Sequence, residues 1–163
     1  MKPTESLPRN TEAVADSLAA MIKRELTTLN HEGYLHPSEP NMITADDRRK
    51  LVDWCYSVVD HCQLSRETVA MAMDMVDRFL SMHYTDEAFL RNQIKFQLLT
   101  ITALYVAIKI NEYAALSSNQ FADMSLGVYT AEEIEDVELT LLTGLSWRCN
   151  APTAHQVGHA ILS

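Results

Sequence analysis

Glycine and proline are scarce in this chain, which has four Gly and five Pro among its 163 residues. Because these residue types form tight turns and interrupt helices, their scarcity disfavours a protein made of many β-hairpins. Methionine, leucine, alanine and acidic residues are plentiful instead. A chain of this length can also bury one continuous core without disulfides or metals. The composition therefore predicts one all-α domain.

Cysteine is scarce too, with only Cys55, Cys62 and Cys149. The odd count argues against a disulfide framework. Cys55 and Cys62 lie on one predicted helix, about 10 Å apart by helical rise, which is too far for a disulfide bond. We therefore expect three thiols in the core.

Basic residues are outnumbered, with 13 Lys and Arg against 22 Asp and Glu and a formal net charge of -9. The resulting field repels phosphate backbones and anionic membrane surfaces. The first residues lack the apolar segment of a signal peptide, and no stretch approaches the length of a membrane-spanning helix. We expect a soluble intracellular protein that binds neither nucleic acid nor membrane.

Motifs that carry catalysis are also missing. Neither GxGxxG nor GxxxxGK followed by Ser or Thr occurs, so nucleotide binding has no support. His155 and His159 have the i, i+4 spacing of metal ligands and Cys149 lies upstream, but no fourth ligand has suitable spacing. His61 precedes Cys62, yet burial of Cys62 against the core would keep this thiol unreactive. We expect no enzyme activity, no metal and no cofactor.

Apolar residues recur at helical spacing in several segments. They predict an amphipathic helix over residues 14–26, followed by a proline-bearing loop over 33–43. Residues 96–110 are apolar on nearly every side, which places this helix in the centre of a bundle. A polar connection is predicted over 81–92 and a last helix after Pro152.

Capping signals mark the starts of the other helices. Thr44 is followed three residues later by Asp47, and Thr130 by Glu133. This spacing is that of a capping box, in which each residue accepts a hydrogen bond from the backbone N–H of the other. The other N-caps are expected at serines, namely Ser65 and either Ser117 or Ser118.

Five ordered blocks of the sequence resemble one known family. They are RRKLVDW (48–54), LSRETVAMAMDMVDRFLS (64–81), QLLTITALYVAIKINE (97–112), DVELTLLTGLSW (136–147) and APTA (151–154). Together they resemble the first cyclin box of the A, B and D type cyclins over about two thirds of the chain. The resemblance implies a five-helix bundle around a buried central helix, preceded by an N-terminal amphipathic helix.

The resemblance also implies three parts of the chain. Residues 1–43 are expected to form a tail, a docking helix and a linker, and residues 44–149 the cyclin box. Residues 150–163 would begin a linker or helix toward a second box, which the family places after the first. No second box follows Ser163, so a one-box cyclin and a fragment both stay open.

By this resemblance the protein is a regulatory subunit that binds and activates a cyclin-dependent Ser/Thr protein kinase in cell-cycle control. Its location would be the nucleus, the cytoplasm or both, and substrates or inhibitors of the kinase are further partners. The alternatives are a cyclin-fold scaffold without kinase activation and a transcription-type cyclin-box protein that touches DNA. Retention of Lys109 and Glu138 argues against the scaffold, and the acidic balance argues against DNA binding.

Five landmark positions of the cyclin box have counterparts here, namely Arg48, Asp77, Leu98, Lys109 and Glu138. The resemblance implies that Arg48 pairs with Asp77 and ties the first two box helices together. It also implies that Lys109 and Glu138 hydrogen-bond the kinase backbone. The complete set of implied kinase-binding residues is Lys109, Glu138, Glu112, Ile110, Val106, Leu139 and Leu142.

A substrate-docking patch, again implied by the resemblance, is only partly matched. Leu51, Trp54 and Gln97 fit the family pattern, but Asp47 and Lys50 stand where the family has apolar residues. Charged groups resist the desolvation that seats an apolar ligand side chain. We therefore expect poor docking of substrates that carry an Arg-x-Leu motif.

Overall fold

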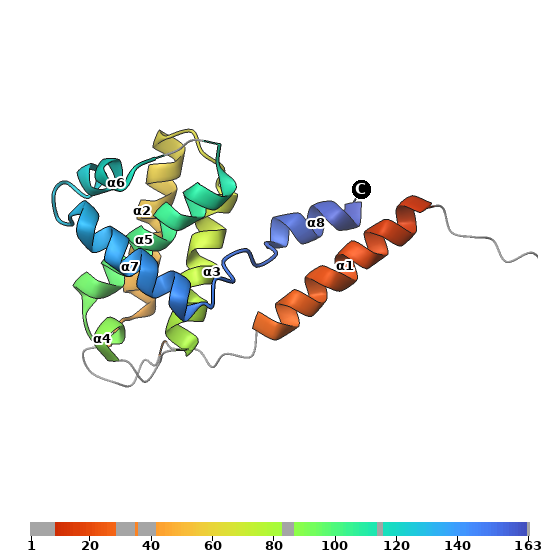
Figure 1. The fold of residues 1–163 in the computed structure, drawn as a ribbon, viewed down its shortest axis with the longest axis horizontal. Helices are drawn as coiled ribbons and strands as arrows, with labels where there is room; N and C mark the ends of the chain where they lie inside the picture. Colours follow the sequence, from red (N-terminus) through yellow and green to blue (C-terminus); the bar gives the residue numbers. More distant parts are fainter. Residues whose placement is uncertain (1–8, 29–34, 36–41, 83–86, 114–115, 163) are drawn as a thin grey trace, which may run out of the picture. The chain divides into compact units, whose positions relative to one another are not determined.

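A computed structural model describes residues 9–28, 35, 42–82, 87–113 and 116–162 of the chain. All regular structure in these ranges is helical, and they contain no strand (Figure 1). The helices are α1 (Arg9–Thr28), α2 (Ala45–His61), α3 (Glu67–Met82), α4 (Glu87–Leu90), α5 (Gln93–Asn111), α6 (Ser118–Met124), α7 (Ala131–Gly144) and α8 (Ala154–Leu162). The prediction of an all-α fold is confirmed.

The described helices divide into two compact units. Helices α1 and α8 contact each other and belong to one unit. Helices α2 to α7 belong to the other, which spans His31–Asn150. Every member of the buried apolar cluster lies in this second unit. The second unit, called the box unit below, therefore holds the core that positions the candidate site.

The capping boxes predicted from the sequence are confirmed. Thr44 Oγ1 accepts a hydrogen bond from the Asp47 N–H at 3.2 Å, and Asp47 Oδ2 accepts one from the Thr44 N–H at 3.0 Å. Thr130 and Glu133 form the same reciprocal pair at the start of α7. Ser117 caps α6 in this way as well, which decides between the two serines proposed for that helix. Each cap satisfies backbone N–H groups that have no partner inside the helix.

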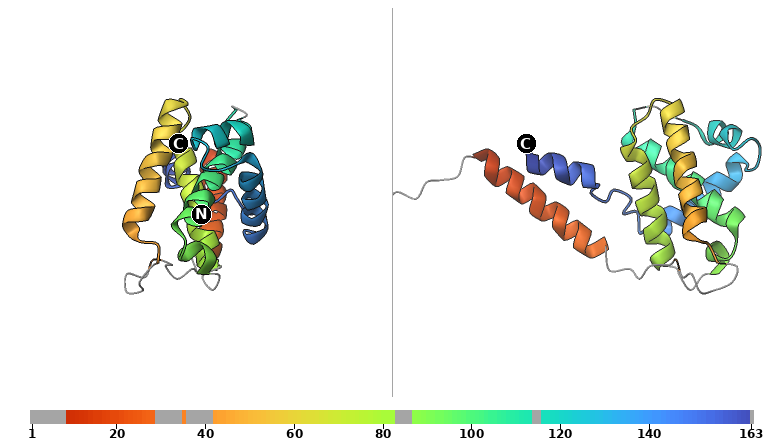
Figure 2. Two further views of the ribbon diagram at one scale, coloured as in Figure 1. Left: turned by 90° about the vertical axis from the view of Figure 1, so that its left-hand side faces the viewer. Right: turned by 180° about the vertical axis from the view of Figure 1, so that it is seen from behind.

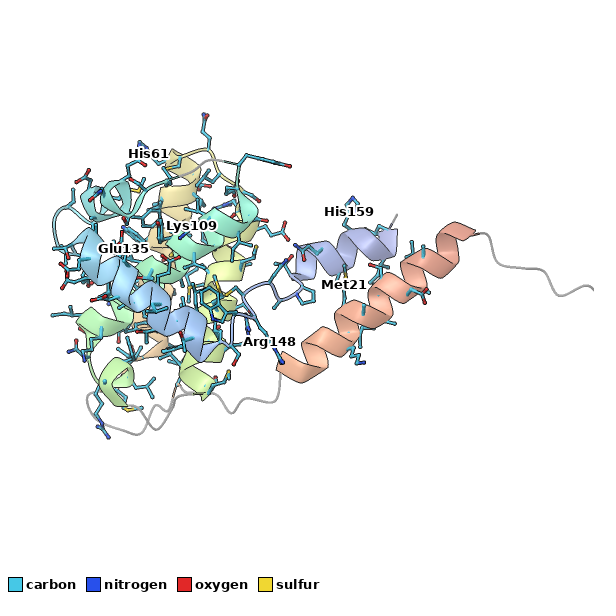
Figure 3. The ribbon with its side chains drawn as sticks, viewed as in Figure 1. Met21, His61, Lys109, Glu135, Arg148 and His159 are labelled. Atoms are coloured by element: carbon cyan, nitrogen blue, oxygen red, sulfur yellow. The ribbon has the colours of Figure 1, made fainter. Side chains whose placement is uncertain are left out.

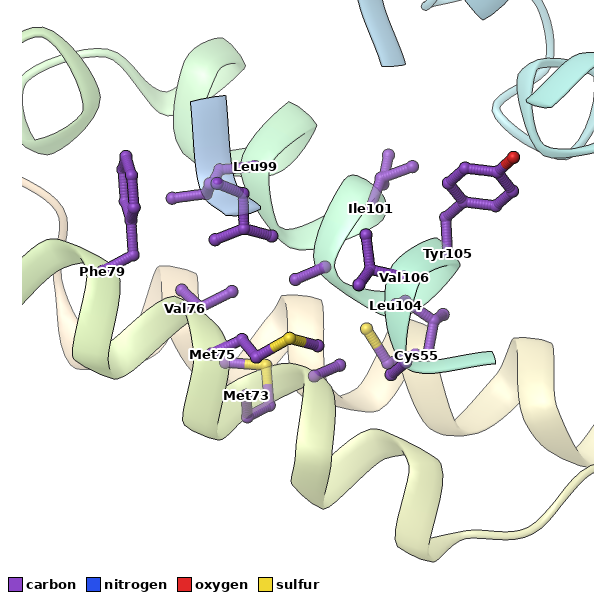
Figure 4. Packing of buried hydrophobic residues seen from close by; sticks show 14 of the residues in the cluster. Cys55, Met73, Met75, Val76, Phe79, Leu99, Ile101, Leu104, Tyr105 and Val106 are labelled. Atoms are coloured by element: carbon purple, nitrogen blue, oxygen red, sulfur yellow. The ribbon is translucent and has the colours of Figure 1, made fainter. Parts of the chain in front are cut away.

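Helix α5 is the centre of the box unit and contacts α2, α3 and α7 (Figures 1 and 2). It begins three residues before the predicted start, because Asn92 Oδ1 accepts hydrogen bonds from the N–H groups of Ile94 and Lys95. Residues 101–108 are all buried. Side chains from α2 and α3 pack against them, as the labelled residues of Figure 4 show. The predicted central helix is confirmed.

One expectation about α5 is wrong, because its 19 residues are long and apolar enough to span a membrane. Of its most apolar stretch, 61% is buried inside the protein. The core helix of a soluble protein meets the same criteria, so this match is weak evidence of membrane insertion.

Helix α4 lies in the segment that was predicted to be a polar connection. Its Phe89 ring packs edge-on against Phe79 of α3, with ring centroids 5.5 Å apart. Leu90 is 2% exposed, and its carbonyl accepts a hydrogen bond from the Ile43 N–H at 2.8 Å. This single turn is held by contacts with distant residues, which local sequence patterns do not reveal.

Candidate partner-binding surface

Lys109 and Glu138 form an ion pair where α5 lies against α7. Lys109 is in the last turn of α5, and its Nζ lies 2.6 Å from Glu138 Oε1. The ammonium also sits over the Tyr105 ring, 4.8 Å from the ring centroid. Figure 3 labels Lys109 on α5. Both residues named from the sequence therefore lie on one edge of the box unit.

The Glu138 side chain is more buried than the Lys109 side chain. The Glu138 side chain is 15% exposed and that of Lys109 is 43% exposed. Partial burial lowers the pKa of Lys109, but the Glu138 carboxylate and the Tyr105 side chain outweigh this, so the net pKa is raised. Lys109 is therefore charged at neutral pH.

Apolar side chains on the same two helices are accessible to a partner. Ile110 on α5 is 44% exposed and Leu139 on α7 is 61% exposed. Leu142 is half-buried against the core. Val106 is 2% exposed, so it supports this surface from beneath and offers no side chain to a partner. The central helix is apolar on all sides, which is why the sequence could not separate Val106 from the exposed positions.

Trp147 is a candidate that the sequence reasoning missed. It is 67% exposed just beyond α7, and its backbone N–H donates to the Leu142 carbonyl at 2.8 Å. Both Ser146 and Trp147 have positive φ angles, of 50° and 60°. Non-glycine residues adopt such angles uncommonly. The sequence signal that could have identified Trp147 is a large aromatic residue directly after an amphipathic helix.

Glu112, also proposed to face the kinase, points elsewhere. Its Oε1 accepts hydrogen bonds from the Ser65 N–H at 2.9 Å and from the Thr68 hydroxyl. The neighbouring Asn111 donates to the same hydroxyl at 2.9 Å. The structure therefore joins Glu112 to the start of α3 and not to the Lys109 and Glu138 pair.

The Arg48 and Asp77 pair implied by the resemblance is present. Arg48 Nε and Nη2 donate to the two carboxylate oxygens of Asp77 at 3.0 and 2.6 Å. This bidentate geometry fixes the orientation of α2 on α3. The two side chains are 30% and 39% exposed, so the pair adds specificity more than stability. Leu98, the fifth landmark, is half-buried and packs on the core.

Arg78, next to Asp77, has a buried role that the sequence did not show. Its side chain is 8% exposed, and its Nε lies 2.7 Å from Asp74 Oδ2. Its Nη1 donates to the Arg148 carbonyl at 2.7 Å, which ties α3 to the segment after α7. Burial raises the pKa of Asp74, although the Arg78 guanidinium opposes that shift.

The docking patch carries the charges that the sequence indicated. Leu51 and Trp54 are half-buried against the core, and Gln97 is exposed and accepts a hydrogen bond from the Tyr129 hydroxyl at 3.2 Å. Hydrogen bonds from Thr44 lower the pKa of Asp47, so its carboxylate is ionised at neutral pH. Whether the patch binds a ligand stays a prediction.

Histidine and cysteine side chains are the candidate metal ligands and nucleophiles in this sequence. No group of three or more His, Cys, Asp or Glu side chains among the described residues could hold a metal ion. Burial raises the pKa of the Cys55 thiol to about 12. Cys62, which was expected in the core, is only half-buried because it is the C-cap of α2.

Comparison with known proteins confirms the resemblance. A family described as "Cyclin, N-terminal domain" matches residues 16–150. The G1/S-specific cyclin-E1 of Mus musculus is 33% identical over 137 residues, which cover 82% of this chain and 31% of that protein. The G2/mitotic-specific cyclin-B of Arbacia punctulata is 28% identical over 141 residues, 86% of this chain and 33% of that protein. The chain spans about a third of the length of the curated relatives it matches.

Proposed function

Because this chain belongs to the cyclin family, we propose that it binds and activates a cyclin-dependent Ser/Thr protein kinase in cell-cycle control. Three relatives carry cell-cycle roles in their names: the G1/S-specific cyclin-E1 and G2/mitotic-specific cyclin-B above, and the S-phase entry cyclin-5 of Saccharomyces cerevisiae. In this proposal the chain acts in the nucleus, the cytoplasm or both, and all catalysis belongs to the kinase.

The Lys109 and Glu138 ion pair is the observation that supports this proposal best. The Lys109 ammonium has three N–H donors and the Glu138 carboxylate has several lone pairs, so their mutual bond leaves hydrogen-bonding capacity on both. A pair of this kind can donate to a backbone carbonyl and accept from a backbone N–H of one partner segment. It would therefore fix the position of that segment on α5 and α7.

Exposed apolar residues would supply the driving force for binding. Ile110, Leu139 and Trp147 lose contact with water when a partner covers them, and burial of apolar surface is favourable. Interfaces commonly combine such apolar residues with a few well-placed polar groups. Substrates or inhibitors of the kinase would then bind to the complex and not to this surface.

Activation in this proposal is a shift between kinase conformations. A partner that binds the active kinase conformation more tightly than the inactive one raises the population of the active form. In protein kinases the active form requires an ion pair between a Lys and a Glu of the kinase itself, together with correctly placed metal-binding residues. The cyclin contributes binding energy for the active form and no reacting group.

Affinity purification of the full chain from cell extract, followed by mass spectrometry, tests this proposal. The expected result is a cyclin-dependent kinase that is retained by the wild-type chain and lost with Lys109→Ala. Recovery of other proteins without a kinase would favour the scaffold alternative. Recovery of DNA would favour the transcription-type alternative, and either result would contradict the proposal.

A further inference from the structure

The end of α5 is held against the start of α3 by a small polar network. Glu112, the C-cap of α5, accepts hydrogen bonds from the Ser65 N–H at 2.9 Å and from the Thr68 hydroxyl. Asn111 Nδ2 donates to the Thr68 hydroxyl at 2.9 Å. These contacts join residues that lie 43 to 47 positions apart in the sequence. They therefore fix tertiary structure and not a local turn.

Thr68 is the buried centre of this network. It is 0% exposed, and its hydroxyl both donates to Glu112 and accepts from Asn111. The Glu112 carboxylate also lies at the N-terminal end of α3, where the helix dipole favours negative charge. Loss of Thr68 or Glu112 would leave polar groups without partners, which is costly in a covered site.

Helix geometry connects this network to the candidate kinase-binding residues. Successive residues of an α-helix are about 100° apart, so Lys109 faces about 200° and Ile110 about 100° away from Asn111. Glu112 is the C-cap and has an extended backbone, with φ -110° and ψ 149°, so the chain turns toward α3 at this residue. Lys109 and Ile110 are exposed, whereas Asn111 and Glu112 are partly covered. Anchoring one side of this last turn therefore determines the direction in which the other side points.

We propose that Glu112 is a positioning residue, which anchors the last turn of α5 to α3 through Thr68 and so presents Lys109 and Ile110 to the kinase. This inference rests on the proposed kinase binding, and it replaces the expectation that Glu112 touches the kinase itself. The inference makes a specific prediction about Thr68, which has no exposed surface. Replacing Thr68 should weaken kinase binding as replacing Glu112 does.

The test measures the affinity of full-length variants for a purified cyclin-dependent kinase, chosen from a panel as the tightest binder of the wild-type chain. Glu112→Ala and Thr68→Val should each weaken binding about tenfold, as expected for loss of hydrogen bonds to a charged group. Glu112→Gln keeps an acceptor oxygen for both donors, so it should stay within about threefold of wild type.

Two further measurements separate positioning from general destabilisation. Val59→Ala in the buried part of α2 should lower the melting temperature without changing affinity well below that temperature. In the free chain, Thr68→Val should speed hydrogen exchange at the Glu112 N–H, which donates to the Ile108 carbonyl at 3.0 Å. This exchange measurement needs no kinase.

A wild-type affinity for Thr68→Val, together with a Glu112→Gln variant as weak as Glu112→Ala, would show that Glu112 contacts the kinase directly. An equal loss of affinity in Val59→Ala would also overturn the inference, because affinity would then follow stability alone. If the wild-type chain binds no kinase in the panel, the proposed function fails. The exchange measurement then still decides whether Glu112 and Thr68 anchor α5.

Discussion

Replacing Lys109 or Glu138 with Ala should abolish kinase activation while the box unit remains folded. Removing one member of a charged pair at a desolvated interface costs about 2 to 5 kcal/mol of binding free energy. Since each 1.4 kcal/mol is a factor of ten, the affinity for the kinase should fall about 30-fold to 4,000-fold. The ion pair of 2.6 Å in the unbound chain shows that both groups are already in place.

The effect on folding should be smaller and should differ between the two variants. Glu138→Ala leaves a Lys109 side chain that is 43% exposed and still lies over the Tyr105 ring. Its cost in unfolding free energy should be below about 1 kcal/mol. Lys109→Ala leaves a Glu138 side chain that is only 15% exposed, and a covered acceptor without its partner costs about 1 to 3 kcal/mol. Lys109→Ala should therefore have the lower melting temperature.

Kinase activity and thermal unfolding of the same purified variants provide the assay. Lys95→Ala on α5 and Glu132→Ala on α7 remove the same charges from exposed positions and serve as controls. Both controls should activate the kinase as the wild-type chain does. Wild-type activation by Lys109→Ala and Glu138→Ala at wild-type concentration would refute the proposed role of this ion pair.

Three other properties follow from the structure. Cys55, whose thiol pKa is raised to about 12, should resist alkylation in the native protein at pH 8, whereas the half-buried Cys62 should react faster. The lowered pKa of Asp47 contributes stability above its unfolded pKa, and that contribution is lost as pH falls through the folded pKa. In urea unfolding, Asp47→Asn should therefore be less stable than wild type by up to about 1 kcal/mol at pH 7, with a smaller difference at pH 2.5. A fluorescent Arg-x-Leu peptide should bind the kinase complex more weakly than about 1 μM, which fluorescence anisotropy would measure, because charges at Asp47 and Lys50 oppose desolvation.

Most helix starts could be predicted because their signals are local. The capping boxes at Thr44 and Thr130 need only two residues three positions apart, and both form as expected. Helix α4 could not be predicted, because the Phe89 contact with Phe79 and the bond to the Leu90 carbonyl come from distant parts of the chain. Local patterns reveal helices that stabilise themselves and miss those that packing stabilises.

The candidate site was predicted less completely than the fold. The resemblance named Lys109 and Glu138, but their direct contact across 29 positions appeared only in the structure. The resemblance placed Val106 and Glu112 on the same surface, but in the structure Val106 lies in the core and Glu112 contacts the start of α3. A central helix that is apolar all round gives no periodic signal for which face is exposed.

Reconstitution of the purified chain with a panel of purified cyclin-dependent kinases tests the proposed function most directly. Phosphorylation of a Ser-containing peptide by at least one kinase should rise at least about a hundredfold and saturate as the chain is added. Each tenfold rise requires the chain to prefer the active kinase conformation by only about 1.4 kcal/mol. A panel in which no kinase binds the chain, or in which a kinase binds it without any rise in activity, would contradict the proposal.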